Sequence, residues 1–150
     1  HIAMAIPKSS DRLEWFLEKA TELGFSKLSL INCTNSERKS INQKRLEKIA
    51  ISALKQSKRY YLPTIETPVP FLTFIKKEPN GYIGHCYEAK KKHAKTISQV
   101  APILIGPEGD FSLKEIENAK SSGYIEIELS KNRLRTETAA LCAVFYLSNV

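Results

Sequence analysis

Apolar and polar positions along the chain switch repeatedly between two periods, which predicts strands alternating with helices. Short apolar runs of the kind that form strands lie at residues 2–6, 27–33, 81–86, 101–105 and 124–129. Between them, apolar residues recur at i, i+3, i+4 and i+7 from Leu13 and from Leu46, a spacing typical of a helix with one buried face. This alternation favours an α/β fold with a mostly parallel sheet and helices on both faces.

Local signals predict where several helices begin and end. Three segments have the spacing of a capping box, which predicts a helix N-terminus at each: Asp11 to Glu14, Ser40 to Gln43, and Ser112 to Glu115. Gly24 and Gly123 are placed to end the first and the third of these helices. A short helix is predicted over 71–75. Residues 137–147 predict a helix that is apolar nearly all round, so we expect it to be buried in the core or against a second subunit.

Positive charge is concentrated in one part of the chain. The formal net charge is +7, and residues 34–61 carry eight basic and two acidic side chains. The basic residues fall largely off the apolar stripe that begins at Leu46, so the predicted helix has a core side and a basic side. Such a surface attracts polyanions with a salt-dependent affinity. A solvated helix face explains the same pattern, and charge alone does not separate the two. We interpret the lysine-rich segment 90–95 as solvated surface.

Composition excludes several classes of protein. No apolar run approaches the roughly 18 residues of a membrane span, and the first residues lack the pattern of a signal peptide. Cys33, Cys86 and Cys142 are too widely spaced for a zinc site and indicate free thiols in a reducing compartment. We therefore expect a cytoplasmic protein without a metal. The chain opens on a strand and lacks an initial methionine, so we expect an N-terminal part to be missing.

Two loops carry the candidate chemistry, because ligands of open α/β sheets bind beyond the carboxyl ends of the strands. The first, 106–112, combines two glycines with Pro107 and leads into a helix N-terminus. It is neither a GxGxxG motif nor a P-loop. Glu108 and Asp110 would repel a phosphate, so a neutral or cationic ligand with hydroxyl groups fits better. A plain turn with a capped helix is the alternative.

The second loop, 130–139, places charged residues and two threonines directly before the apolar helix. Polar groups in that position need partners. Capping by Thr136 or Thr138, together with an ion pair between Arg135 and Glu137, would account for part of the loop. Asn132 and Arg133 remain without a structural role, which favours a ligand site.

These loops resemble a known family. The sequences IGPEGDFS at 105–112 and RLRTETA at 133–139 are similar to the two signature loops of the RsmE family, the 16S ribosomal RNA uridine N3-methyltransferases of the SPOUT superfamily. Segments 11–15, 19–24, 36–38 and 56–59 also resemble the family's pattern, in the same order. The resemblance runs from about Ala5 to the C-terminus. The family usually has glycine where Asp110 and Ser130 stand.

The resemblance implies a fold and an activity that periodicity does not show. It implies a SPOUT methyltransferase catalytic domain over residues 1–150 with a C-terminal trefoil knot, although general topology rules disfavour knots. It also implies S-adenosylmethionine as methyl donor, 16S ribosomal RNA of the small subunit as substrate, and a homodimer with the site near the subunit interface. The small N-terminal RNA-binding domain of the PUA-like kind has no room in this chain.

The resemblance also implies roles for individual residues. Arg135 would stabilise negative charge on the uracil, and Glu137 would orient Arg135 or assist loss of the N3 proton. The cofactor would be held by Leu104, Ile105, Gly106, Pro107, Glu108, Gly109, Leu129, Ser130, Asn132, Arg133, Leu134 and Thr136. RNA phosphates would be held by Arg38, Lys44, Arg45, Lys55 and Arg59. His85 either borders the pocket or is a satisfied structural histidine, and we favour the structural role.

Two other functions are compatible with parts of the sequence. A non-catalytic RNA-binding module derived from the same fold would use the same basic helix. A nicotinamide-dependent oxidoreductase is disfavoured, because no GxGxxG motif follows any predicted strand. Cofactor binding distinguishes these functions from methyl transfer.

Overall fold

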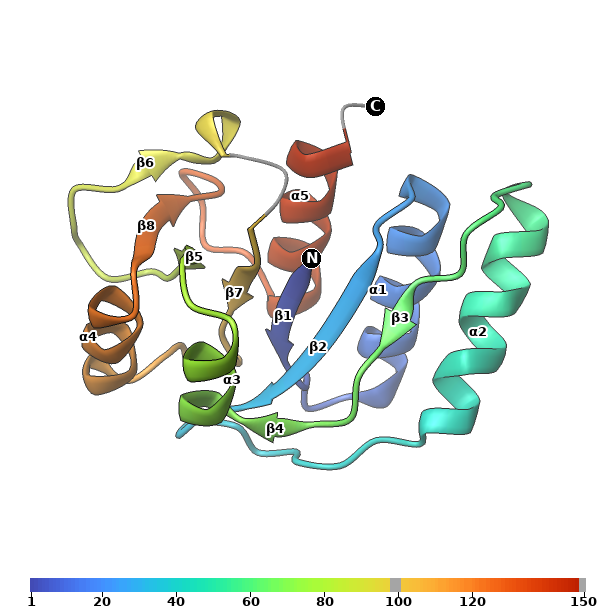
Figure 1. Cartoon of the computed structure of the whole chain (residues 1–150), viewed down its shortest axis with the longest axis horizontal. Coiled ribbons are helices and arrows are strands. Elements are labelled where there is room, and N and C mark those ends of the chain that lie inside the picture. The colour runs from blue at the N-terminus through green and yellow to red at the C-terminus, as the bar shows by residue number, and fades with distance from the viewer. Residues whose placement is uncertain (98–100, 149–150) are drawn as a thin grey trace.

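The computed structural model of the chain describes residues 1–97 and 101–148, which form an α/β arrangement of strands and helices (Figure 1). The strands of this part of the chain are β1 (Ile2–Ala5), β2 (Lys27–Asn32), β3 (Thr64–Ile65), β4 (Val69–Pro70), β5 (Gly81–Gly84), β6 (Lys92–His93), β7 (Ile103–Ile105) and β8 (Tyr124–Glu128). The helices are α1 (Ser10–Leu23), α2 (Gln43–Gln56), α3 (Phe71–Lys77), α4 (Leu113–Ser121) and α5 (Thr136–Ser148), with a 3₁₀ turn at Ala94–Thr96.

The strands form one parallel sheet in the order β3-β2-β1-β7-β5-β8-β6, and β4 extends the edge beside β2. β1 lies inside the sheet, where Ala3 is aligned with Ser29 of β2 on one side and with Leu104 of β7 on the other. The predicted parallel sheet is confirmed. β3, β4 and β6 were not predicted, because two residues are too few to show a period.

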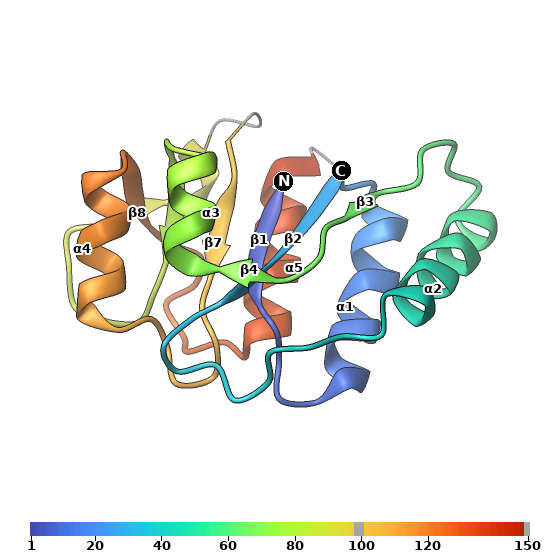
Figure 2. The ribbon, with the colours of Figure 1, turned by 60° about the horizontal axis from the view of Figure 1, so that its bottom comes forward.

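Helices cover both faces of the sheet, as the sequence predicted. α1, α2 and α5 pack on one face, and α3 and α4 pack on the other (Figures 1 and 2). Alternate residues of β1 serve the two cores: Ile2 and Met4 pack toward α1 and α5, whereas Ala3 and Ala5 pack toward α3. A strand buried on both faces must be apolar throughout, which explains the continuous apolar runs in the sequence.

One of the three predicted capping boxes is confirmed. The Ser112 hydroxyl accepts from the Glu115 N–H, and the Glu115 carboxylate accepts from the Ser112 N–H. The other two predictions are wrong. α1 begins at Ser10, which leaves Asp11 inside the first turn, where the helix dipole favours an acid. α2 is capped by Asn42, which accepts from the Arg45 N–H and lies nearer to the helix than Ser40.

The predicted helix ends agree better with the structure. Gly24 ends α1 with φ +89°, a left-handed conformation that glycine adopts without a steric penalty. α4 ends at Ser121 with Ser122 as its C-cap, and Gly123, at φ +86°, is the next residue. α5 buries Ala140, Ala143 and Val144, but Phe145 on its outer side is 54% exposed, so the expected burial is met on one side only. In the described residues, every helix is too short or too polar to cross a membrane.

Candidate functional site

The carboxyl ends of β5, β7 and β8 and the loops that follow them line an open cavity of about 740 Å³. This volume lies within the range of small-molecule sites, roughly 300–1,000 Å³. Both loops singled out in the sequence line it. The predicted cofactor residues that line the cavity are Ile105, Gly106, Pro107, Glu108, Leu129, Ser130, Asn132, Arg133, Leu134 and Thr136. Arg135 also lines the cavity, whereas Leu104, Gly109 and Glu137 are not part of its wall.

A buried hydrogen bond holds the two loops together. The Thr136 hydroxyl donates to the backbone carbonyl of Gly106 at 3.0 Å, and Thr136 is 4% exposed. A Cβ on Gly106 would lie 3.1 Å from the ring of Phe111, so a larger residue would crowd this turn. The absence of a side chain at position 106 therefore lets the ring of Phe111 pack against the turn of the first loop.

Asp110 adopts a left-handed conformation, with φ +64°. Its side chain compensates, because one carboxylate oxygen accepts from the Phe111 N–H and the other from the Cys86 N–H, each at 2.8 Å. A glycine adopts this φ freely but offers neither acceptor. Asp110 thus joins the loop after β7 to the end of β5. Ser130 acts locally, since its hydroxyl accepts from the Asn132 N–H at 3.1 Å.

Arg12, in the first turn of α1, is a cavity residue that the sequence did not reveal. Its guanidinium lies between two carboxylates, with Nε 3.6 Å from Oε1 of Glu137 and Nη1 3.8 Å from Oε1 of Glu108. The Glu137 side chain is 8% exposed, and its Oε2 is buried without a hydrogen-bond partner. The expected ion pair between Arg135 and Glu137 is wrong, because Glu137 faces α1 on the inner side of α5.

His85 combines the two roles considered for it. It lines the cavity, and its side chain is only 1% exposed, with Nε2 3.0 Å from Oε1 of Glu126. Lys120 holds the other oxygen of Glu126 at 3.0 Å. Burial and the nearby charge of Lys91 lower the pKa of His85, which favours the neutral ring. The Nδ1 atom is buried and has no hydrogen-bond partner.

The cysteines and acids provide no second kind of chemistry in the described part of the chain. All three cysteines are free, and burial raises the pKa of Cys33, Cys86 and Cys142, so their thiols are protonated and weakly nucleophilic. Within residues 1–97 and 101–148, no three His, Cys, Asp or Glu side chains are grouped so that they could hold a metal.

The predicted RNA-binding residues lie on and around α2, away from the cavity wall. Three of them have structural partners: Arg38 donates to the Ser40 carbonyl, Arg45 pairs with Glu14, and Arg59 donates to the backbone carbonyls of Glu22 and Leu23. Lys44 and Lys55 are exposed. These two lysines are therefore the members of the set best able to reach a phosphate.

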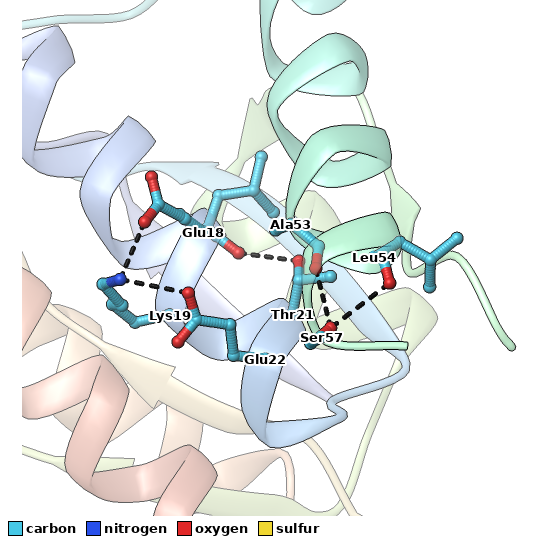
Figure 3. Close-up of polar contacts among 8 residues, drawn as sticks. Glu18, Lys19, Thr21, Glu22, Ala53, Leu54 and Ser57 are labelled. Atoms are coloured by element: carbon cyan, nitrogen blue, oxygen red, sulfur yellow. Dashed lines mark hydrogen bonds and ion pairs between the residues drawn. The ribbon is translucent and has the colours of Figure 1, made fainter. Parts of the chain in front are cut away.

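Besides the contacts of Arg59 with the end of α1, each of the polar contacts that Figure 3 shows near the C-terminal ends of α1 and α2 stays within one helix or its cap. Lys19 pairs with Glu18 and Glu22, at 2.7 and 3.0 Å, which neutralises its charge. The buried Thr21 hydroxyl donates to the Leu17 carbonyl, and the Ser57 hydroxyl donates to the Ala53 carbonyl, each at 2.7 Å. The positive surface is therefore carried by α2 and its flanks rather than by α1.

Comparison with known proteins identifies similar chains. The RNA methyltransferase domain family matches residues 1–148. The chain is 33% identical over 150 residues to ribosomal RNA small subunit methyltransferase E of Rickettsia conorii, covering 95% of this chain and 61% of that protein. It spans less than two thirds of the length of such curated relatives.

Two solved structures have the same fold over nearly the whole chain. One is a probable rRNA-methyltransferase from Porphyromonas gingivalis, with a TM-score of 0.89 and 39% identity, covering 99% of this chain and 67% of that one. The other is a ribosomal RNA small subunit methyltransferase E from Neisseria gonorrhoeae bound to S-adenosyl methionine, with a TM-score of 0.87 and 26% identity, covering 99% and 64%.

Proposed function

Since the chain belongs to the family of RNA methyltransferase domains, and within it resembles the RsmE enzymes, we propose that it is the catalytic domain of a 16S ribosomal RNA methyltransferase. The proposed reaction transfers the methyl group of S-adenosylmethionine to N3 of a uridine in the small ribosomal subunit. The observation that carries this proposal is the convergence of the two signature loops on one cavity, where Thr136 is bonded to Gly106.

The cavity suits a ligand that carries both signs of charge, as S-adenosylmethionine does. Its wall includes apolar side chains on which an adenine can rest, among them Ile105, Ile127 and Leu129. Backbone at Gly84 and Gly106 is free of side chains, so a ligand can approach it closely. The wall carries acidic side chains, Glu108, Asp110 and Glu128, together with basic ones, Arg12, Lys91, Lys131, Arg133 and Arg135, which suits a ligand that has both cationic and anionic groups. When bound, the cofactor supplies an electrophilic methyl group on a sulfonium. The loops at 104–109 and 129–136 would hold it.

Arg135 is the proposed catalytic residue of the second loop. It lines the cavity and is exposed there. Methylation of N3 requires that N3 lose its proton, which leaves negative charge on the uracil ring, and a fixed guanidinium stabilises that charge. Glu137 does not line the cavity, so we assign it an indirect role, in which its carboxylate holds an arginine in place.

Cofactor binding and methyl transfer test the proposal separately. Isothermal titration with S-adenosylhomocysteine should give measurable heat, and the variant Arg135→Ala should retain that binding while methyl transfer to small subunits is abolished. Lys114→Ala, on the exposed side of α4, is the matched control and should keep full activity. Wild-type activity in Arg135→Ala would contradict the role of Arg135. RNA binding without any cofactor heat would favour a non-catalytic RNA-binding module.

The outer side of α5 supports a homodimer. Cys142 and Tyr146 are partly exposed beside the exposed Phe145 on the side of α5 that faces away from the core, whereas Leu141 and Leu147 pack against the core. An apolar face of this kind is stabilised when a second copy covers it. Sedimentation of the wild-type protein as a dimer and of Phe145→Glu as a monomer is the expected result. A monomeric wild-type protein would contradict the proposed dimer.

The path of α5 supports the trefoil knot expected for this family. α5 follows β8, which lies near one edge of the sheet, yet it packs on β1 and α1 across the middle. We propose that residues 129–148 thread through the preceding loops to reach that place. A crystal structure whose traced chain is unknotted would contradict this. We also propose a cytoplasmic location and a PUA-like RNA-binding domain outside this chain.

A further inference from the structure

Arg12 lines the cavity with its donor groups free. Its two ion pairs, to Glu108 at 3.8 Å and to Glu137 at 3.6 Å, are longer than hydrogen bonds. A guanidinium carries five N–H donors. In the described part of the chain, none of these five makes a hydrogen bond to another residue. Its side chain is 36% exposed, so a ligand in the cavity can reach it.

Helix stability does not explain an arginine at this place. Arg12 lies in the first turn of α1, where the helix dipole disfavours a cation. Neither carboxylate is fully paired with Arg12. Glu108 accepts a hydrogen bond from the Lys8 N–H at 3.0 Å, and Oε2 of Glu137 is buried without a hydrogen-bond partner. A cluster built only to join α1 to α5 would pair these groups more completely, because an unpaired buried carboxylate oxygen costs stability.

The two carboxylates hold the guanidinium at the meeting point of the two signature loops. Glu108 belongs to the loop after β7, and Glu137 belongs to the first turn of α5. Arg135 lines the same cavity from the second loop. Three guanidinium groups therefore border the cavity, those of Arg133 and Arg135 from the second loop and that of Arg12 from α1. A uracil that has lost its N3 proton shares the negative charge between the two oxygens that flank N3, so it offers one acceptor to each of two arginines.

We propose that Arg12 is a second catalytic residue, one that binds an oxygen flanking N3 of the target uracil and stabilises the anion that precedes methyl transfer. This inference rests on the proposed function. The N3–H bond breaks and the proton passes to solvent water. The N3 electron pair then forms the bond to the methyl carbon as the carbon–sulfur bond breaks, and its electrons remain on sulfur. Glu137 is a positioning residue that acts through Arg12.

The experiment compares kcat, KM and the pH profile for wild type, Arg12→Gln, Arg12→Lys and the control Lys19→Gln, a cation on the same helix. Small subunits reconstituted from 16S transcripts with either uridine or 5-fluorouridine serve as substrates, because fluorine makes the N3 proton more acidic. Arg12→Gln should lower kcat on uridine by about 10²–10³-fold, as removal of one charge-stabilising donor does elsewhere. Its profile should shift to higher pH, and 5-fluorouridine should restore most of the lost rate. Lys19→Gln should behave as wild type.

Other results would overturn the inference. An equal loss on both substrates would assign Arg12 a structural role, and a salt-dependent rise in KM alone would assign it to an RNA phosphate. A weaker Kd for S-adenosylhomocysteine, measured by titration, would assign it to the cofactor. If Arg12→Gln does not fold, Arg12→Lys should still show the pH shift in part. Glu137→Gln should add no further loss to Arg12→Gln, because both changes remove one interaction. An inactive wild type that binds no S-adenosylhomocysteine would overturn the proposed function itself.

Discussion

The Thr136 hydroxyl donates a hydrogen bond to the backbone carbonyl of Gly106, and this bond joins the first residue of α5 to the loop that leaves β7. Both residues are buried and both line the cavity. In the part of the chain that the structure describes, Thr136 is the side chain that holds the Gly106 carbonyl, so the shape of the cavity depends on a contact between residues distant in sequence. Loss of this bond should therefore affect stability and ligand binding together.

Replacing Thr136 by valine removes the donor and keeps the volume. The unpaired carbonyl of Gly106 should cost about 1–3 kcal/mol of the free energy of unfolding, measured by urea denaturation. Binding of S-adenosylhomocysteine should weaken as well. Thr136→Ser keeps the hydroxyl and is the matched control, which should retain most of the binding. Equal stability of the valine variant and the wild type would contradict the importance of this bond.

Asp110 allows backbone strain to be measured apart from hydrogen bonding. Asp110→Ala and Asp110→Gly both remove the two acceptors used by Cys86 and Phe111, but only alanine is penalised at φ +64°. The glycine variant should therefore be more stable than the alanine variant by about 1–2 kcal/mol. Thermal or urea unfolding of the pair checks this. An alanine variant as stable as the glycine variant would show that the loop relaxes to another conformation.

His85 should make stability depend on pH. Burial and Lys91 lower the pKa of His85 in the folded protein, so the unfolded chain takes up the proton first. The folded state should therefore lose stability as the pH falls below about 6.5, the ordinary value for histidine, and show no contribution from this residue at higher pH. Urea unfolding at several pH values should give a shallower dependence for His85→Gln. An unchanged dependence would exclude His85 as its source.

The exposed lysines of α2 should contribute to RNA binding, whereas Arg59 should contribute to stability as well. Lys44→Gln with Lys55→Gln should weaken binding to 16S RNA and lower the slope of log affinity against log salt by about 1 for each lost phosphate contact. Arg59→Gln should lower the free energy of unfolding by about 1 kcal/mol, because it removes the donors to Glu22 and Leu23. An unchanged salt slope in the double variant would place the RNA elsewhere.

Local sequence signals predicted those parts of the fold that depend only on residues close together in the sequence. The capping box at Ser112 and the glycine end at Gly24 need only neighbouring residues, and both are confirmed. Asp11 and Ser40 fit the same local pattern, yet the helices begin elsewhere, because Asn42 offers a nearer cap and α1 extends back to Ser10. A capping pattern thus predicts a helix nearby more reliably than it predicts its first residue.

The candidate site was predictable in its loops but not in its contacts. Glycines and charges after two apolar strands indicated the cavity, since parallel strands end at a common edge. The partner of Glu137 could not be predicted, because Arg135 is close in sequence whereas Arg12 reaches it only through the packing of α1 on α5. The unusual position of Arg12 at a helix N-terminus was the signal available in the sequence.

The position of β1 inside the sheet has a consequence for the order of folding. Of the two neighbours of β1, β2 is synthesised soon after it, whereas β7 follows about a hundred residues later. At a synthesis rate of roughly 5–20 residues per second, β7 is made roughly 5–20 s after β1. During that time the edge of β1 that pairs with β7 has no partner strand. α5 is made later still and supplies both Thr136 and Glu137. The cavity therefore cannot be complete before α5 has been synthesised and has packed, which makes ligand binding a measure of completed folding.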